Sequence, residues 1–175
     1  MGHFHSVKDL LENGYKVRGT VRSLTSKDKY SHLLDLPHAK ENLELMEADL
    51  LVDGSFDQVV KGSIAVFHTA SPFFFGATDP QKQLIEPALN GTRNVLSAVV
   101  KNLETVKRVI VTSSVAAVYN PTTAKPGVYN EEIWNTESSL TDEPYCYSKA
   151  LAEREAWKFA QEYNISLTTV NPPFI

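Results

Sequence analysis

Apolar and polar positions along the chain change period repeatedly, from the two-residue alternation of strands to the three- and four-residue spacing of helices. Short apolar runs between polar or glycine residues predict strands, and longer amphipathic stretches predict helices. Predicted strands cover residues 15–22, 43–47, 64–69, 108–112 and 165–170. Predicted helices cover residues 6–12, 26–36, 55–60, 79–102 and 143–163. This alternation of strand and helix predicts an α/β fold with a parallel sheet.

Boundary residues refine the pattern. Ser6 and Asp9 have the spacing of a capping box at the start of the first helix, and Gly14 ends that helix. Pro87 predicts a bend in helix 79–102, because a proline inside a helix removes one backbone hydrogen bond. Residues 120–140 contain Pro, Gly, Thr and Asn without a regular period, which predicts an irregular loop.

Composition narrows the class of protein. A chain of 175 residues suits one domain, and its formal net charge of -4 favours neither a nucleic acid nor an anionic membrane as a partner. The longest apolar runs, such as residues 64–67, are far too short to span a bilayer. The single cysteine, Cys146, excludes an internal disulfide and favours a reducing compartment. We therefore expect a cytoplasmic domain that binds neither nucleic acid nor membrane.

Three side chains indicate a chemistry. Tyr145 and Lys149 lie four residues apart at the start of a predicted helix, so they share one face, where an ammonium lowers the pKa of a phenol and makes it a proton donor. Ser114 follows strand 108–112, at the sheet edge where open α/β folds bind ligands, and its hydroxyl can hold a carbonyl oxygen. The chemistry predicted is reduction of a small-molecule ketone or aldehyde. No side chain delivers a hydride, so a nicotinamide cofactor is implied.

Several stretches together resemble one known family. They are residues 14–22, 47–57, 66–72, 111–114 and 145–153, in this order and at this spacing. With them the chain, from about residue 7 to residue 175, resembles the extended short-chain dehydrogenase/reductases, also called the NAD-dependent epimerase/dehydratase family. Within that family it is most similar to the dihydroflavonol reductase and cinnamoyl-CoA reductase group.

The resemblance implies a Rossmann-like doubly wound parallel sheet and NADP(H) as cofactor. By this resemblance Ser114 orients the substrate carbonyl, Tyr145 donates the proton, and Lys149 holds the nicotinamide ribose. The remaining expected cofactor contacts are Arg22 on the 2′-phosphate with Lys29 as its helper, Asp49 and Leu50 beside the adenine, Thr69, Ala70 and Ser71 along the middle of the cofactor, and Pro172 on the nicotinamide side.

The chain departs from the family pattern at both ends. The family begins with a strand and a glycine-rich turn that cradles the pyrophosphate, whereas Gly2 is the only glycine before Gly14 here. The family also continues beyond Ile175 with a smaller substrate lobe. We therefore expect residues 1–175 to form a partial NAD(P)-binding Rossmann-like domain that lacks the first strand with its glycine-rich loop and the C-terminal substrate lobe. The missing strand would pair with strands 15–22 and 64–69 at the centre of the sheet.

Two other functions fit the same residues. One is NAD-dependent epimerisation or dehydration of a sugar nucleotide, or dehydrogenation of a steroid. The other is a catalytically silent fragment, which the absent glycine-rich turn favours. The two long predicted helices form a dimer interface in many members of the family, so both a monomer and a homodimer are open. Phe73, Phe74 and Phe75 fit either one wall of an aromatic substrate pocket or plain core, and the lack of strand alternation before Gly76 favours the pocket wall.

Overall fold

The strands that the structure describes lie in two separate parallel sheets. The computed structural model describes residues 2–71 and 76–173, so the predicted aromatic wall at Phe73–Phe75 lies outside the described residues. One sheet pairs β1 (Val17–Val21) with β2 (Leu43–Glu47). The other has the order β3 (Ala65–His68), β4 (Arg108–Thr112) and β5 (Leu167–Val170). The α/β fold with parallel strands is confirmed.

The break between the two sheets falls between β1 and β3. In the first sheet Val17 lies opposite Leu43, and in the second Ala65 lies opposite Arg108 and Val109 opposite Leu167. Within residues 2–71 and 76–173, no strand pairs with both β1 and β3. This is the place where the sequence puts the missing central strand, so the expectation of a Rossmann-like sheet without that strand is confirmed.

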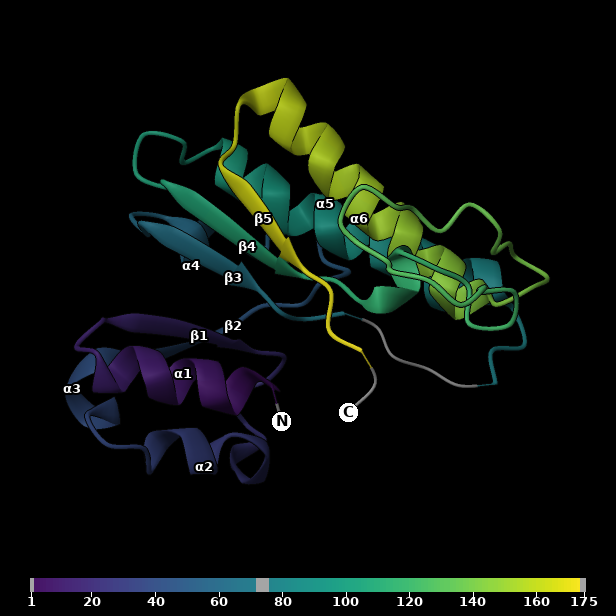
Figure 1. Ribbon diagram of the computed structural model, residues 1–175. Coiled ribbons are helices and arrows are strands. Elements are labelled where there is room, and N and C mark those ends of the chain that lie inside the picture. The colour runs from purple at the N-terminus through teal and green to yellow at the C-terminus, as the bar shows by residue number, and fades with distance from the viewer. Residues whose placement is uncertain (1, 72–75, 174–175) are drawn as a thin grey trace.

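Helices of very different length surround the sheets. The two long helices α5 (Glu86–Val100) and α6 (Pro144–Tyr163) pack against each other on one face of β3–β4–β5 (Figure 1). Helix α1 (Gly2–Glu12) packs against β1 (Figure 1). The short helices are α2 (Ser31–Leu34), α3 (Ala39–Asn42), α4 (Asp57–Val60), η1 (Lys27–Lys29), the π-type turn η2 (Gln81–Ile85) and η3 (Val115–Ala117). No described helix combines the length and apolar character needed to cross a membrane.

Two hydrophobic cores of unequal size hold these layers together. The larger core lies between β3–β4–β5, α4, α5 and α6, and its central side chains Leu96, Val99, Val109 and Ala156 are fully buried. The smaller core lies between α1 and the β1–β2 sheet, around Leu11, Leu36 and Ala39. Burial of apolar surface is the main favourable term in folding, so most of the stability comes from the larger core.

Arg18 on β1 links the smaller half of the molecule to the larger. Its guanidinium Nη1 donates to the carbonyl oxygens of Gln58, Val59 and Lys61 at 3.3, 2.7 and 3.0 Å. Its Nε donates to a carboxylate oxygen of Glu44 on β2 at 3.0 Å. The C-terminal carbonyls of a helix lack partners within that helix. Arg18 therefore satisfies the end of α4 and ties β1 to the larger core.

Several predicted helix boundaries are wrong. Helix α1 begins at Gly2, not at the predicted cap Ser6, and α3 was not predicted. The predicted helix 26–36 is two pieces, η1 and α2, because Tyr30 between them has a non-helical φ of -134°. The predicted helix 79–102 is the π-type turn η2 followed directly by α5, which ends at Val100. Pro87 lies in the first turn of α5, close to where the two meet, and the bend expected there stays a prediction.

Candidate active site

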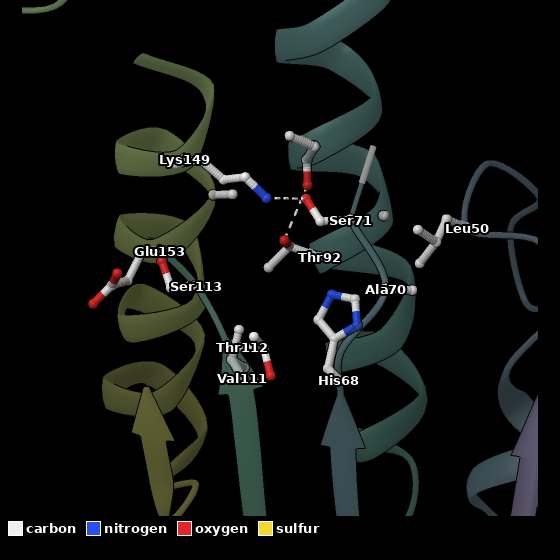
Figure 2. Close-up of a pocket in the computed structure, with 13 residues that line it drawn as sticks. Leu50, His68, Ala70, Ser71, Thr92, Val111, Thr112, Ser113, Lys149 and Glu153 are labelled. Atoms are coloured by element: carbon white, nitrogen blue, oxygen red, sulfur yellow. Dashed lines mark hydrogen bonds between the residues drawn. The ribbon is translucent and has the colours of Figure 1, made fainter. Parts of the chain in front are cut away.

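A small pocket opens where the carboxyl ends of β3 and β4 meet helices α5 and α6 (Figure 2). Among the residues that line it, the predicted cofactor contacts are Leu50, Ala70, Ser71 and Lys149. Such an edge is where open α/β sheets bind ligands, because the polar ends of several strands converge there. The structure thus brings residues from β2's end, β3's end and α6 to one place, although they are up to 99 positions apart in the sequence.

Lys149 contributes a positive charge to the lining of this pocket. Its side chain is buried, and its Nζ donates to the Ser71 hydroxyl at 2.5 Å (Figure 2). The same Nζ lies 5.3 Å from the ring centroid of Tyr145. Burial lowers the pKa of Lys149 to about 8, because removing an ammonium from water disfavours its charged form. Lys149 is therefore still largely charged at neutral pH, but it loses its proton far more readily than an exposed lysine.

Tyr145 lies half-buried one helical turn before Lys149. The pKa of its phenol is raised, first by burial and then by the thiol of Cys146, while a hydrogen bond with the Ser114 side chain lowers it. The expected net lowering of this pKa is wrong for this structure, because burial is the largest cause and raises it. A raised pKa keeps the phenol protonated near neutral pH, as a proton donor requires.

Ser114 follows β4 and is held from several sides. It is buried, and its Oγ accepts a hydrogen bond from the backbone N–H of Ala116 at 3.2 Å. Its neighbours pair with the end of β5 and the chain just after it: the Ser113 N–H donates to the Val170 carbonyl at 2.8 Å, and the Val115 N–H to the Pro172 carbonyl at 3.1 Å. The predicted Pro172 contact thus lies beside Ser114, outside the pocket lined by Lys149.

Of the residues predicted for the phosphate and adenine end, Leu50 lines this pocket, whereas Arg22, Lys29 and Asp49 are not among the residues that line it. Arg22, just after β1, and Lys29, in η1, are both exposed. No ion pair joins Arg22 to another of the residues described, unlike Arg18 on β1. Asp49 acts as a turn residue in the structure, since its Oδ1 accepts from the Leu51 N–H at 2.8 Å. Thr69 is half-buried at the end of β3.

Four residues stand out among those that line the pocket and were given no site role from the sequence. Thr92 lines the pocket and donates its hydroxyl hydrogen to the Ala88 carbonyl at 2.9 Å. Gly91, one residue earlier on α5, lies so close to Leu50 that an added Cβ would meet it at 3.3 Å. His68, read from its apolar strand as a core histidine, is buried but also lines the pocket (Figure 2). Glu153 is the fourth, and its four-residue spacing from Lys149 was a signal that could have found it.

Fold and site together define the class: an α/β protein whose Rossmann-like sheet places Ser, Tyr and Lys side chains at its ligand-binding edge. The chain belongs to the NAD dependent epimerase/dehydratase family, whose model matches residues 4–174.

Reductases are among the similar proteins. The chain is 47% identical over 173 residues to a cinnamoyl-CoA reductase (CAD2) of Medicago truncatula, covering 97% of this chain and 53% of that protein. It is 43% identical over 171 residues to a dihydroflavonol 4-reductase of Dianthus caryophyllus, covering 95% of this chain and 47% of that protein. Among solved structures, Gre2 of Candida albicans in complex with NADPH matches with a TM-score of 0.84 and 36% identity, over 97% of this chain and 54% of that chain. This chain therefore spans about half the length of these relatives.

Proposed function

We propose that this chain carries the proton-donating half of an NADPH-dependent carbonyl reductase, acting on a ketone, an aldehyde or a thioester-derived carbonyl. The observation that carries the proposal is the meeting of the Tyr145 phenol with the Ser114 hydroxyl and the Lys149 ammonium, brought from the end of β4 and from α6. The names of the cinnamoyl-CoA and dihydroflavonol reductases support this substrate class. The one free cysteine, Cys146, supports a cytoplasmic location.

The cationic and hydroxyl side chains of the site suit the two ends of NADPH. At the pocket, Lys149 and Ser71 offer an ammonium and a hydroxyl, which suit the hydroxyls of a ribose, while Ala70, Thr69 and Pro172 lie along the same edge of the sheet. Away from the pocket, Arg22 and Lys29 present exposed positive charge, which suits a 2′-phosphate. Asp49 and Leu50, of which Leu50 lines the pocket, are assigned to the adenine. NADPH, when bound, supplies the hydride.

The chain's own residues handle the oxygen of the substrate. Ser114 Oγ donates a hydrogen bond to the carbonyl oxygen and so holds it beside Tyr145. The Tyr145 phenol then gives its proton to that oxygen as negative charge develops there. The Lys149 ammonium, 5.3 Å from the phenol ring centroid, stabilises the phenolate that remains.

Replacement of Tyr145 tests this proposal. We expect Tyr145→Phe to lower NADPH-dependent reduction of dihydroflavonol or cinnamoyl-CoA by about 10²–10⁴-fold, because general acid catalysis contributes about that much. The matched control is Tyr147→Phe, a half-buried tyrosine in the same turn of α6, which should keep its activity. A Tyr145→Phe protein that reduces the carbonyl as fast as the unaltered chain would refute the role of Tyr145.

Replacement of Arg22 tests the choice of cofactor. We expect Arg22→Ala to weaken NADPH binding about 10-fold and to leave NADH binding unchanged, because only NADPH carries the phosphate that a guanidinium binds. Lys27→Ala, another exposed cation in η1, serves as the control. Equal weakening of NADPH binding and NADH binding, measured by isothermal titration calorimetry, would show that Arg22 does not bind the 2′-phosphate.

A second candidate function is that the chain alone is catalytically silent. It is favoured by the break between β1 and β3 and by Phe67, an apolar side chain on β3 that is 46% exposed. Unpaired strand edges and open apolar surface weaken a fold whose net stability is only about 5–15 kcal/mol. A folded chain that shows no NADPH binding in titration would support this candidate. Tight stoichiometric binding with turnover would exclude it.

A further inference from the structure

The side-chain amide of Asn171, just after β5, makes two hydrogen bonds that take no part in the proposed reaction or in cofactor binding. Its Nδ2 donates to the main-chain carbonyl of Ser114 at 3.1 Å and to Glu153 Oε2 on α6 at 2.7 Å. An amide NH₂ carries two hydrogens, so one side chain can make both bonds at once. Asn171 therefore bridges the segment that carries Ser114 and the helix that carries Tyr145.

The first arm of the bridge completes a short ladder. The Ser113 and Val115 N–H groups donate to the Val170 and Pro172 carbonyls, on either side of Asn171. The Asn171 side chain adds the bond to the Ser114 carbonyl between them. With the Ala116 N–H on its Oγ, Ser114 is then fixed at both its main chain and its side chain.

The second arm ends on a buried carboxylate. Glu153 is only 7% exposed, and a buried carboxylate needs hydrogen-bond donors. Its Oε2 accepts from Asn171, and its Oε1 accepts from Trp157 Nε1 at 3.4 Å. Tyr145, Lys149 and Glu153 follow each other at four-residue spacing, so they lie along one side of α6. A bond to Glu153 therefore sets where Tyr145 stands relative to Ser114.

We propose that Asn171 is a positioning residue that, through Glu153, holds the Ser114 hydroxyl against the Tyr145 phenol. The proposal rests on the function proposed above, because it assumes that Ser114 acts together with Tyr145. Asn171 itself is not among the residues that line the pocket beside Lys149. Its effect is to fix the distance between two residues that come from different elements.

The ionisation of Tyr145 reports on this distance directly and needs no catalysis. The hydrogen bond with Ser114 favours the phenolate, so a displaced Ser114 raises the pKa of the phenol. The titratable groups beside Tyr145 are Lys149 and Cys146, and Glu143 and Asp142 act on Cys146. Asparagine carries no charge, so an Asn171 variant changes none of these groups. It does take one hydrogen-bond donor from Glu153, further along α6, and the Glu153 variants separate that effect.

The experiment follows the titration of 3-fluorotyrosine at position 145 by ¹⁹F NMR, since fluorine makes the phenol more acidic and easier to titrate. We expect Ser114→Ala to raise the midpoint by up to about one pH unit, and Asn171→Ala by about half as much. In a Ser114→Ala background, Asn171→Ala should add nothing. The control Asn102→Ala removes another buried asparagine, whose amide bonds Ala98 at the far end of α5, and should leave the midpoint unchanged.

Glu153 variants keep the test decisive if Asn171→Ala does not fold. Glu153→Gln retains an acceptor for Asn171, so the midpoint should not rise, whereas Glu153→Ala loses the acceptor and should raise it. Loss of the carboxylate charge alone would lower the midpoint, so the two effects differ in sign. An unchanged or lowered midpoint in Glu153→Ala, or a further rise from Asn171→Ala without the Ser114 hydroxyl, overturns the proposal. Failure of carbonyl reduction alone does not affect the titration, so it overturns only the proposed function.

Discussion

The two halves of the molecule differ in how deeply their strands are buried. In β4, Val109 and Val111 lie in the larger core, whereas no residue of β1 or β2 is fully buried. The serine, tyrosine and lysine of the proposed site lie on the well-packed half, and Arg22 and Lys29 lie on the other. Groups that must be held in fixed geometry therefore lie in the rigid part, while the exposed cations lie where packing is thinnest.

The largest expected effect comes from the larger core. We expect Leu96→Ala to lower the free energy of unfolding by about 2–5 kcal/mol, because it leaves a cavity among fully buried side chains. Leu11→Ala in the smaller core should instead open only α1, β1 and β2. Hydrogen exchange checks this difference: Leu96→Ala should speed exchange throughout, and Leu11→Ala only in residues 2–47. Equal loss of protection in β4 with Leu11→Ala would show that the two halves unfold as one unit.

The next effect is the pH dependence due to Lys149. Its pKa is lowered from 10.5 to about 8, so the folded state binds this proton less well than the unfolded state. The free energy of unfolding should therefore rise with pH between about 8 and 10.5, by roughly 3 kcal/mol at most. Below about pH 8 the destabilisation due to Lys149 is at its full value. The raised pKa of Tyr145 acts in the opposite direction above about pH 10.

Lys149→Met isolates this contribution. The variant should be more stable than the unaltered chain near neutral pH, and urea denaturation between about pH 7 and pH 9.5 should no longer show the rise. Lys158→Met, at an exposed position of the same helix, is the control, and its stability should still rise with pH. A rise that persists without Lys149 would assign it to another group.

The smallest of the three effects tests the link between the halves. We expect Arg18→Met to cost about 1–3 kcal/mol, since three carbonyls at the end of α4 lose their donor. Arg18→Lys keeps the charge but not the planar guanidinium, so the stability of this variant should lie between that of the unaltered chain and that of Arg18→Met. The measurement is the midpoint of urea denaturation, compared between variants whose dependence of unfolding free energy on urea concentration has the same slope. A stable Arg18→Met protein would mean that apolar contacts alone join the halves.

Much of the fold was predictable because local pattern and tertiary environment agree. The strands 43–47 and 108–112 were predicted to the residue, as each is a short apolar-rich run with clear boundaries. Helix α3 was missed because His38 before it adopts a left-handed φ of 65°, which the sequence does not show. At the candidate site, the spacing of Tyr145 and Lys149 was visible in the sequence. The Asn171–Glu153 bond was not, because it depends on how β5 packs against α6.

Gly91 shows how a single hydrogen atom sets the width of the candidate pocket. It lies within α5, where glycine costs about 0.5–1 kcal/mol relative to alanine, and its Cα faces Leu50. A methyl group there would stand 3.3 Å from the Leu50 side chain, closer than ordinary packing, so Leu50 would have to shift by a few tenths of an ångström. The stability of helix α5 and the volume of the pocket therefore place opposite demands on this position. A sequence chosen for thermal stability alone would place alanine there and crowd the cavity beside Lys149.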